Sequence, residues 1–572
     1  MKTNLTPIQR FFRLLKADRK DITRIFTFAA LAGGINLTLP LGVQAIINYL
    51  SGGIVSTSWV ILVILVIAGL MLAGIMQVMQ LSLIETIQER IFQRSAFEFA
   101  IRIPRIQLEQ VTSKYAPELI NRFFDTLSLQ KGLSKFMLDI GTSSLQIVFG
   151  IILLSFYHPS FILFGLALVL VLYLVIRITG PRGLRTSIDE STYKYQVAFW
   201  LEELARTMNT FKLAGNSSLP VERTDNLVTN YLSSRKDHFK VLMTQYLSIV
   251  GFKGLVAGGL LVIGSLLVLD GQINLGQFVA AEIIIIMIIN SSEKLILAIE
   301  PVYDVLTALE KIALVTDLDL EREDGVPFHK PKEGPISLSL RNLKYGTGML
   351  NQPLVDGITL DIEAGERVLV HGYSGSGRTK LLELISGLYQ GYQGSIVYDD
   401  QPASSLNLRS LRCQIGDSLS EEEIFEGTIE ENILLGKEWL TKEDMIWACK
   451  RIGLYDYIKK LHHGFQTPLT PKGSGLPEHI VRKIKMVRSI VEKPALVIWQ
   501  ESLHVFSEVD KQQIMECMIA REQPWTLVVN SGSKRLARQC DNIVLLEDGK
   551  MIFHGTYSEL ETHQELIDLF YE

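Results

Sequence analysis

The chain contains one glycine-rich segment whose spacing is suited to binding phosphate. The segment reads RVLVHGYSGSGRTKLLELISGL, and this order predicts a strand, a loop and a helix that begins near Arg378. Gly372, Gly375 and Gly377 let the backbone curl so that several amides point inward, and the helix adds the positive end of its dipole. We expect a phosphate group to bind there.

The segment from Gly372 to Thr379 keeps the pattern Gly-x-x-x-x-Gly-Lys-Ser/Thr except at one position. Arg378 stands where the pattern has lysine. An ammonium is a compact point charge, whereas a guanidinium is a wide planar fork that must sit differently beside the phosphates. The hydroxyl of Thr379 is retained as a candidate magnesium ligand. The loop therefore predicts phosphate binding with an altered basic group.

An α/β domain is predicted around this loop. A charged linker, DLDLEREDGVPFHKPKEGP, precedes it, and short β-rich runs then alternate with helical ones. We place a transmembrane domain at 1–323, the linker at 324–335 and the α/β domain at 336–572. The formal net charge is -5, from 56 basic and 61 acidic residues, so no nucleic-acid partner is expected.

Apolar stretches in the first half are long enough to cross about 30 Å of hydrocarbon. They lie at 25–50, 59–83, 136–157, 161–178, 241–269 and 275–299. The connections 85–135 and 177–240 are polar and helical in pattern, so we expect the spanning helices to continue through them into the cytoplasm. The sequence thus predicts an all-α six-helix transmembrane domain.

Charge in the loops predicts the orientation in the bilayer. The segment before the first span is rich in basic residues, whereas SGGIVSTS after it has no charge. The N-terminus and the α/β domain are therefore expected in the cytoplasm. Glu282 lies in the last apolar stretch, where a carboxylate either belongs to a substrate or ion pathway or sits at the outer headgroups.

Further motifs give the chain a resemblance to the ABC exporter family, in which a transmembrane domain is fused to an ATP-binding cassette. EGTIEENILLG resembles the stretch after the Q-loop, and CDNIVLLEDGKMIFHGTYSEL resembles the last strands of the cassette. In the first half, VAFWLEELARTMNTFKLAG resembles the cytoplasmic loop before the fifth span. The resemblance implies a P-loop NTPase-like cassette and covers nearly the whole chain.

Several positions depart from the residues that the family uses for hydrolysis. Ser420 aligns with the Q-loop glutamine, and LPEHI, which begins at Leu476 and ends at Ile480, replaces the LSGGQ signature. Pro477 has no N–H to donate, and Glu478 would bring negative charge toward the γ-phosphate. Gln500 replaces the Walker B aspartate, and Gly532 replaces the switch histidine. The resemblance therefore implies a degenerate cassette.

Glu501 occupies the position of the catalytic glutamate; the alternative, which we favour, is a solvated helix-cap carboxylate. Tyr345 is either an adenine-stacking aromatic or an exposed strand tyrosine. The resemblance implies weak binding of ATP and magnesium. The predicted nucleotide-binding residues are Tyr345, Gly372, Tyr373, Ser374, Gly375, Ser376, Gly377, Arg378, Thr379 and Gln500.

The resemblance implies a membrane subunit of an export or secretion system that hydrolyses ATP weakly or not at all. Two alternatives remain: a scaffold or regulator that does not transport, and an active exporter with atypical ATP sites. The expected partners are the lipid bilayer, a second copy or another ABC half-transporter, and other secretion components. We expect a bacterial inner membrane location. No cysteine precedes Cys413, so no cysteine-peptidase domain is expected.

Overall fold

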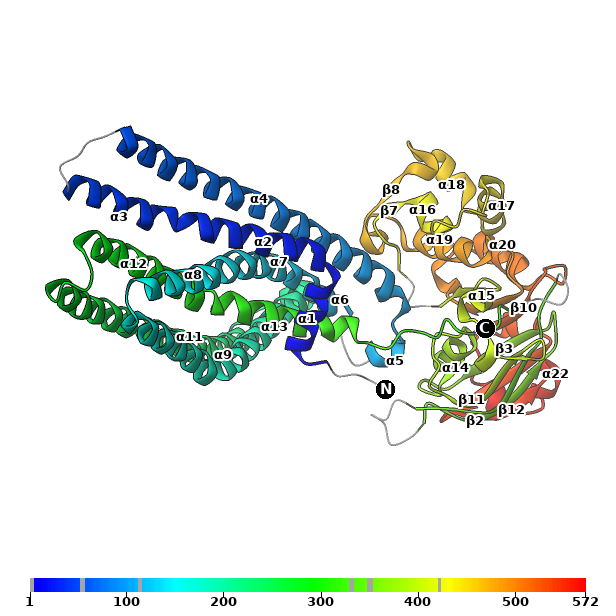
Figure 1. Cartoon of the computed structure of the whole chain (residues 1–572). Coiled ribbons are helices and arrows are strands. Elements are labelled where there is room, and N and C mark those ends of the chain that lie inside the picture. The colour runs from blue at the N-terminus through cyan, green and yellow to red at the C-terminus, as the bar shows by residue number, and fades with distance from the viewer. Residues whose placement is uncertain are drawn as a thin grey trace. The chain divides into compact units, whose positions relative to one another are not determined.

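The computed structural model describes residues 5–51, 57–111, 116–328, 334–346, 353–419 and 423–571. The chain divides into two compact units (Figure 1). One comprises Met1–Arg105 and Lys114–Leu318, and the other comprises Ile106–Ser113 and Asp319–Glu572. The second unit thus includes a short segment from within the first half of the chain.

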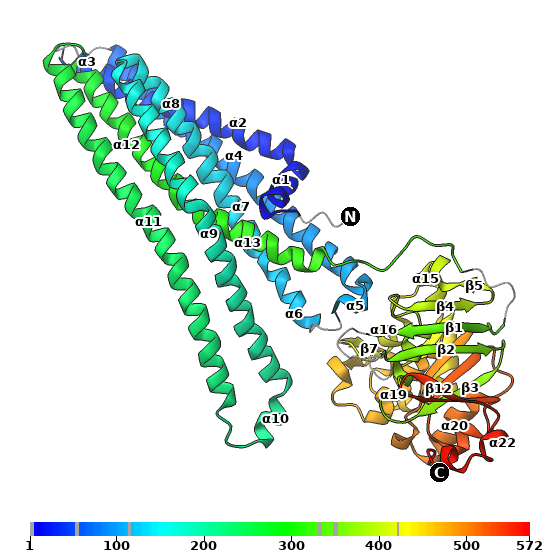
Figure 2. The same ribbon diagram turned by 90° about the horizontal axis from the view of Figure 1, so that it is seen from below.

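The first unit is helical in its described residues, and its long helices α9 and α11 run side by side (Figure 2). Its α-helices are α1 (Pro7–Ala17), α2 (Arg19–Asn36), α3 (Thr38–Ser51), α4 (Thr57–Arg102), α6 (Ala116–Ile120), α7 (Asp125–Lys135), α8 (Gly141–Tyr157), α9 (Ser160–Arg206), α10 (Met208–Leu213), α11 (Leu219–Leu269), α12 (Leu275–Leu297) and α13 (Ile299–Thr316).

Several of these helices are long and apolar enough to cross a membrane. The qualifying segments are Arg19–Ser51, Thr57–Arg105, Glu118–Tyr157, Phe161–Arg206 and Leu219–Leu269. The predicted stretch 275–299 covers α12, which is not among the segments that qualify, and whose Glu282 is half-buried. The prediction of a helical transmembrane domain is confirmed, whereas the count of six spans stays a prediction.

Pro40 explains where the first apolar stretch is broken. Helix α2 ends at Asn36, and α3 begins at Thr38, so Pro40 lies in the first turn of α3. A proline is tolerated in a first turn because its missing N–H has no partner there, whereas deeper in a helix it would clash with the preceding turn. The break at Leu37 thus avoids a kink inside one continuous helix.

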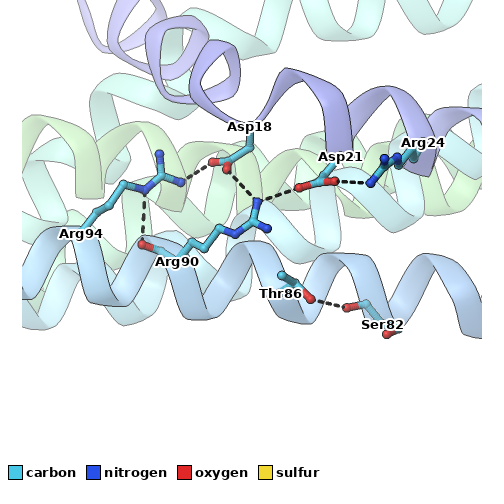
Figure 3. A network of polar contacts seen from close by, with 7 residues as sticks. All are labelled: Asp18, Asp21, Arg24, Ser82, Thr86, Arg90 and Arg94. Carbon is cyan, nitrogen blue, oxygen red and sulfur yellow. Dashed lines mark hydrogen bonds and ion pairs between the residues drawn. The ribbon is translucent and has the colours of Figure 1, made fainter.

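A network of charged side chains joins the start of α2 to α4 (Figure 3). Arg90 on α4 forms ion pairs with Asp21 at 2.6 Å and with Asp18 at 3.5 Å. Arg94, one turn further along α4, also pairs with Asp18, whose side chain is buried. Arg24 approaches Asp21 at 3.1 Å from the other side. The two carboxylates therefore fix the N-terminal turn of α2 against α4.

The second unit is built on two larger sheets with helices around them (Figures 1 and 2). One has the order β2-β1-β4-β5 and is antiparallel, and the other has the order β12-β11-β3-β10-β9-β6. Its strands are β1 (Leu338–Tyr345), β2 (Val355–Ile362), β3 (Arg367–Gly372), β4 (Gln393–Tyr398), β5 (Gln401–Pro402), β6 (Ile415–Ser418), β7 (Gly427–Thr428), β8 (Pro468–Leu469), β9 (Leu496–Gln500), β10 (Thr526–Asn530), β11 (Asn542–Glu547) and β12 (Lys550–Gly555).

The strands β11, β3, β10, β9 and β6 are parallel, and the apolar runs of the first four are buried on both faces, as is usual for parallel sheets. The α-helices of this unit are α5 (Leu108–Val111), α14 (Arg378–Ile385), α15 (Leu408–Arg412), α16 (Ile429–Leu434), α17 (Lys442–Ile452), α18 (Tyr455–Lys460), α19 (Glu478–Ile490), α20 (Glu508–Ile519), α21 (Lys534–Ala537), α22 (Tyr557–Leu560) and α23 (Gln564–Ile567). The carboxyl ends of β3, β10 and β9 are adjacent, which is where parallel sheets bind ligands.

The short helix α5 is held in this unit by its glutamate. Glu109 Oε1 accepts hydrogen bonds from the backbone amides of Gln390 at 2.6 Å and Gly391 at 2.9 Å. Gln110 exchanges hydrogen bonds with Asp319, where the chain re-enters the unit. These polar contacts explain why Ile106–Ser113 belongs to the α/β unit.

Candidate nucleotide-binding site

The glycine-rich loop has the backbone of a phosphate-binding nest. It follows β3 and leads into α14, which begins at Arg378 as the sequence predicts. Gly372, Gly375 and Gly377 have φ values of 146°, 85° and 90°, which favour glycine. A Cβ on Gly377 would lie 2.0 Å from the carbonyl oxygen of Leu354, so no side chain fits there. The loop conformation thus depends on these glycines.

Two groups in the loop lack partners that a phosphate would supply. Ser376 Oγ is buried and has no hydrogen-bond partner among the described residues. The half-buried guanidinium of Arg378 pairs with no described carboxylate, and burial lowers its pKa. Its Nη1 donates instead to His371 Nδ1 at 3.1 Å. The loop therefore fits a phosphate, although its cation lies against an imidazole.

The candidate metal ligands are neutral. Gln500 ends β9, and its Oε1 is buried without a hydrogen-bond partner in the described ranges. Thr379 lies in the first turn of α14. Magnesium favours carboxylate oxygens beside the phosphates, and an amide or hydroxyl oxygen is a weaker ligand. The described part of the chain also contains no group of three acidic, histidine or cysteine side chains able to hold a metal ion.

Glu501 is half-buried and accepts hydrogen bonds from three donors, one of them at the start of a 3₁₀ turn, as a helix-cap carboxylate would. Its Oε2 accepts from Ser531 Oγ at 3.0 Å and from the Tyr571 hydroxyl at 2.7 Å. Its Oε1 accepts from the backbone amide of Leu503, at the start of a 3₁₀ turn. The carboxylate is therefore fixed next to the end of β10, and its catalytic role stays a prediction.

Gly532, at the predicted switch position, has no room for a side chain. A Cβ there would lie 2.7 Å from His371 Cε1 and 2.7 Å from Tyr571 Cε1. The His371 ring is buried, whereas Tyr571 is 56% exposed, so a side chain at position 532 would have to displace at least the Tyr571 ring. The space that a switch side chain would need is thus filled by residues of this same chain.

The segment LPEHI lies at the start of α19. Pro477 is the residue before the helix, with φ −59° and ψ 142°, and no side chain caps this end. Glu478 opens the helix and forms an ion pair with Arg482 at 3.0 Å, with its side chain 64% exposed. A helix start can bind an anion through its free amides, but here a carboxylate faces solvent at that end.

Tyr345, at the end of β1, is 5% exposed, packs against Tyr389 at 5.4 Å and has Lys380 Nζ over its ring at 5.8 Å. It is therefore not the exposed strand tyrosine of the second alternative, and its stacking on adenine stays a prediction. Ser420, the predicted Q-loop position, lies outside the described residues.

Sequence reasoning missed the segment 569–571, which touches two of the predicted positions and His371. Tyr571 contacts Glu501 and occupies the space that a Cβ on Gly532 would need. The Leu569 carbonyl accepts a hydrogen bond from His371 Nε2 at 3.0 Å. The segment has no motif, and only its aromatic residues next to a helix could have drawn attention to it. Its role appears only when distant parts of the chain are brought together.

Comparison with known families supports both units. Residues 22–292 match the ABC transporter transmembrane region, and residues 355–504 match the family described as ABC transporter. A bacterial Atm1-family ABC exporter with ATP bound has the same fold, with a TM-score of 0.83 and 17% sequence identity over 96% of this chain and 97% of that one.

Curated relatives are distant in sequence. The transport/processing ATP-binding protein ComA of Streptococcus pneumoniae is 23% identical over 556 residues, which are 96% of this chain and 76% of ComA. The alpha-hemolysin translocation ATP-binding protein HlyB of Escherichia coli is 24% identical over 372 residues, 64% of this chain and 52% of HlyB. YfiB of Bacillus subtilis, an uncharacterised ABC transporter ATP-binding protein, is 30% identical over 252 residues, 44% of this chain and 43% of YfiB.

A bundle of long apolar helices joined to an α/β cassette with a phosphate loop defines a membrane half-transporter. The chain belongs to the ABC transporter family, with the fold of its exporters. Its cassette matches the ATP-binding domain of this family, and the match implies that the cassette binds ATP. The prediction of an exporter-type transmembrane domain followed by a cassette is confirmed.

Proposed function

We propose that this chain is a catalytically impaired subunit of an export system, a pseudo-ATPase half-transporter. The observation that carries the proposal is the filled space beside Gly532. In the family, a side chain at this position helps to hold the γ-phosphate and the attacking water. Here the space holds the rings of His371 and Tyr571, so a side chain at position 532 would first have to displace them.

Three further features support weak or absent hydrolysis. Pro477 offers no amide at the start of α19, and Glu478 places negative charge there. Gln500 offers a neutral oxygen where a carboxylate would hold magnesium. Phosphoryl transfer depends mainly on positioning and charge stabilisation, and one such group is worth about 10²–10³ in rate. Several losses together leave little turnover.

Pairing with another chain does not complete a site. In this family each ATP lies between the phosphate loop of one cassette and the signature of the other. In a symmetric dimer, each ATP site would have both an altered phosphate loop and an altered signature. With an intact partner, the partner's phosphate loop would face LPEHI, and the partner's signature would face the loop with Arg378. We propose a homodimer or a heterodimer in which energy or gating comes from other components of an export system.

The relatives support an export role but do not identify the cargo. ComA is a transport/processing protein and HlyB an alpha-hemolysin translocation protein, so we propose peptides or proteins as the class of cargo. We propose a bacterial inner membrane location with the N-terminus and the cassette in the cytoplasm, because basic residues concentrate before the first span and in the long connections.

The test is steady-state ATP hydrolysis by the full chain in lipid nanodiscs with magnesium. The proposal predicts a rate no higher than that of the Glu501→Gln variant. A turnover typical of exporters that Glu501→Gln abolishes would instead establish an active exporter with atypical sites. Mass measurement of the detergent-extracted complex, run in parallel, distinguishes a homodimer from a heterodimer or a larger assembly.

A further inference from the structure

The segment 569–571, which we call the cap segment, is attached to the loop after β10 by backbone hydrogen bonds. The amide of Tyr571 donates to the carbonyl of Gly532 at 2.9 Å, and the amide of Lys534 donates to the carbonyl of Tyr571 at 2.9 Å. Tyr571 also forms a parallel bridge with Ser533. Tyr571 of the cap segment is thus joined to the loop after β10 by a single isolated bridge.

The cap segment holds the only carboxylate predicted to act in hydrolysis. The Tyr571 hydroxyl donates to Glu501 Oε2 at 2.7 Å. Burial and the nearby Glu501 charge raise the pKa of Tyr571 to about 12, so the phenol keeps its proton and remains a donor. A hydrogen bond to an ionised acceptor is about twice as strong as a neutral one. Glu501 is therefore held by a charge-assisted bond from the cap.

The same segment also reaches the basic group of the phosphate loop, through His371. The Leu569 carbonyl accepts from His371 Nε2 at 3.0 Å, and the ring of Phe570 lies 4.6 Å from the imidazole. With its proton on Nε2, His371 accepts at Nδ1 from Arg378. The cap segment therefore fixes the imidazole against which the guanidinium lies.

These contacts converge on Glu501 and Gly532, which stand at the positions that the resemblance to the family places beside the γ-phosphate. We propose that the cap segment is an intrachain latch that competes with the terminal phosphate of a nucleoside triphosphate, so that the chain binds the triphosphate more weakly with the latch closed than with it open. This inference rests on the proposed function, because it assumes that the loop from Gly372 to Thr379 binds nucleotide phosphates.

The latch predicts a difference between triphosphate and diphosphate. A diphosphate reaches the glycine nest but not the end of the site beside Glu501 and Gly532, so the cap opposes only the triphosphate. The apparent affinity of a ligand falls by the fraction of the protein that is competent to bind it. A latch that is closed nine-tenths of the time therefore weakens triphosphate binding about tenfold.

Binding by the full chain in nanodiscs tests this with ADP and with a β,γ-imido analogue of ATP that is not hydrolysed. For Tyr571→Ala we expect the Kd of the analogue to fall about tenfold and the Kd of ADP to change less than about twofold. Tyr571→Phe keeps the ring over Gly532 but loses the bond to Glu501, so a smaller fall, about threefold, is expected. Tyr557→Phe, outside the cap, is the matched control and should change neither Kd.

A measurement on the unaltered chain keeps the proposal testable if Tyr571→Ala does not fold. The analogue should speed hydrogen exchange at the amide of Lys534, which donates to the cap, and ADP should not. Equal effects of the two nucleotides, no change in either Kd, or no binding of either nucleotide by any variant would each overturn the latch. Because the analogue is not hydrolysed, these outcomes are independent of the hydrolysis rate that tests the proposed function.

Discussion

His371 Cε1 lies 2.7 Å from the point where a Cβ on Gly532 would be. Real Cβ atoms do not approach a ring carbon so closely, so the two positions constrain each other. His371 accepts a hydrogen bond from Arg378 of the phosphate loop, and Gly532 lies two residues beyond the end of the neighbouring strand β10. The absence of a side chain at position 532 is therefore required by this packing.

The first prediction concerns the replacement of Gly532 by alanine. Forcing a methyl group against the rings of His371 and Tyr571 should destabilise the cassette by about 1–3 kcal/mol, the usual cost of overpacking. Thermal unfolding of the full chain in detergent would show a lowered transition for the cassette. Gly391→Ala is the control, because its nearest neighbour to a new Cβ is 3.5 Å away. A Gly532→Ala transition equal to that of the control would contradict this account of the packing.

An ion pair with a buried lysine gives the second prediction. Lys483, whose side chain is 4% exposed, donates to Asp510 at 2.6 Å and to the carbonyl of Gly453 at 2.9 Å. Asp510→Ala leaves a buried charge without its partner, which costs about 3–5 kcal/mol. The exposed pair of Lys511 with Glu508 is the comparison, and Glu508→Gln should cost less than about 1 kcal/mol. Equal losses in the two variants would show that burial does not matter here.

The same carboxylate predicts a dependence on pH. Burial tends to raise the pKa of Asp510, but the hydrogen bonds from Lys483 and Ser507 prevail and lower it. Because the folded pKa is below the unfolded one, this stabilisation is present above the unfolded pKa near 3.9 and is lost as the pH falls through the folded value. The difference in stability between the unaltered chain and Asp510→Asn should therefore shrink in acid. A constant difference would contradict the shift.

His371 is expected to cause a second dependence on pH. Here the group is a buried base, whereas Asp510 is an acid. Burial lowers the pKa of His371 below its ordinary 6.5, and the charge of Arg378 lowers it further, while the bond to the Leu569 carbonyl opposes the shift. Below pH 6.5 the unfolded chain binds more protons, so the stability of this packing falls as the pH decreases. After correction for the intrinsic effect of pH on exchange, the Lys534 amide should exchange its hydrogen faster at acid pH. The His371→Gln variant should lose this dependence on pH.

Local patterns in the sequence predicted the secondary structure around the phosphate loop and the two kinds of unit. The glycines before Arg378 and the apolar run of β3 predicted the phosphate-binding loop, because these residues lie close together in the sequence. Features of this kind are determined by nearby residues, so they can be seen without a structure.

The remaining features depend on contacts between distant residues. Tyr571 meets Glu501 across 70 positions, and Glu109 meets Gln390 across 281, and neither pair has a shared motif. The burial of Tyr345 under Lys380 and the hydrogen bond of Glu501 to Ser531 were missed for the same reason, since both depend on which elements pack together. Patterns along the chain do not reveal such pairs.

The most direct test of the central claim is a density map of the full chain with Mg-ATP in lipid nanodiscs. The proposal predicts that nucleotide, where bound, has its phosphates in the loop from Gly372 to Thr379 and is not enclosed between two closed cassettes. Mg-ATP clasped between two closed copies, with Gln500 holding the metal and Pro477 and Glu478 facing the γ-phosphate, would contradict it.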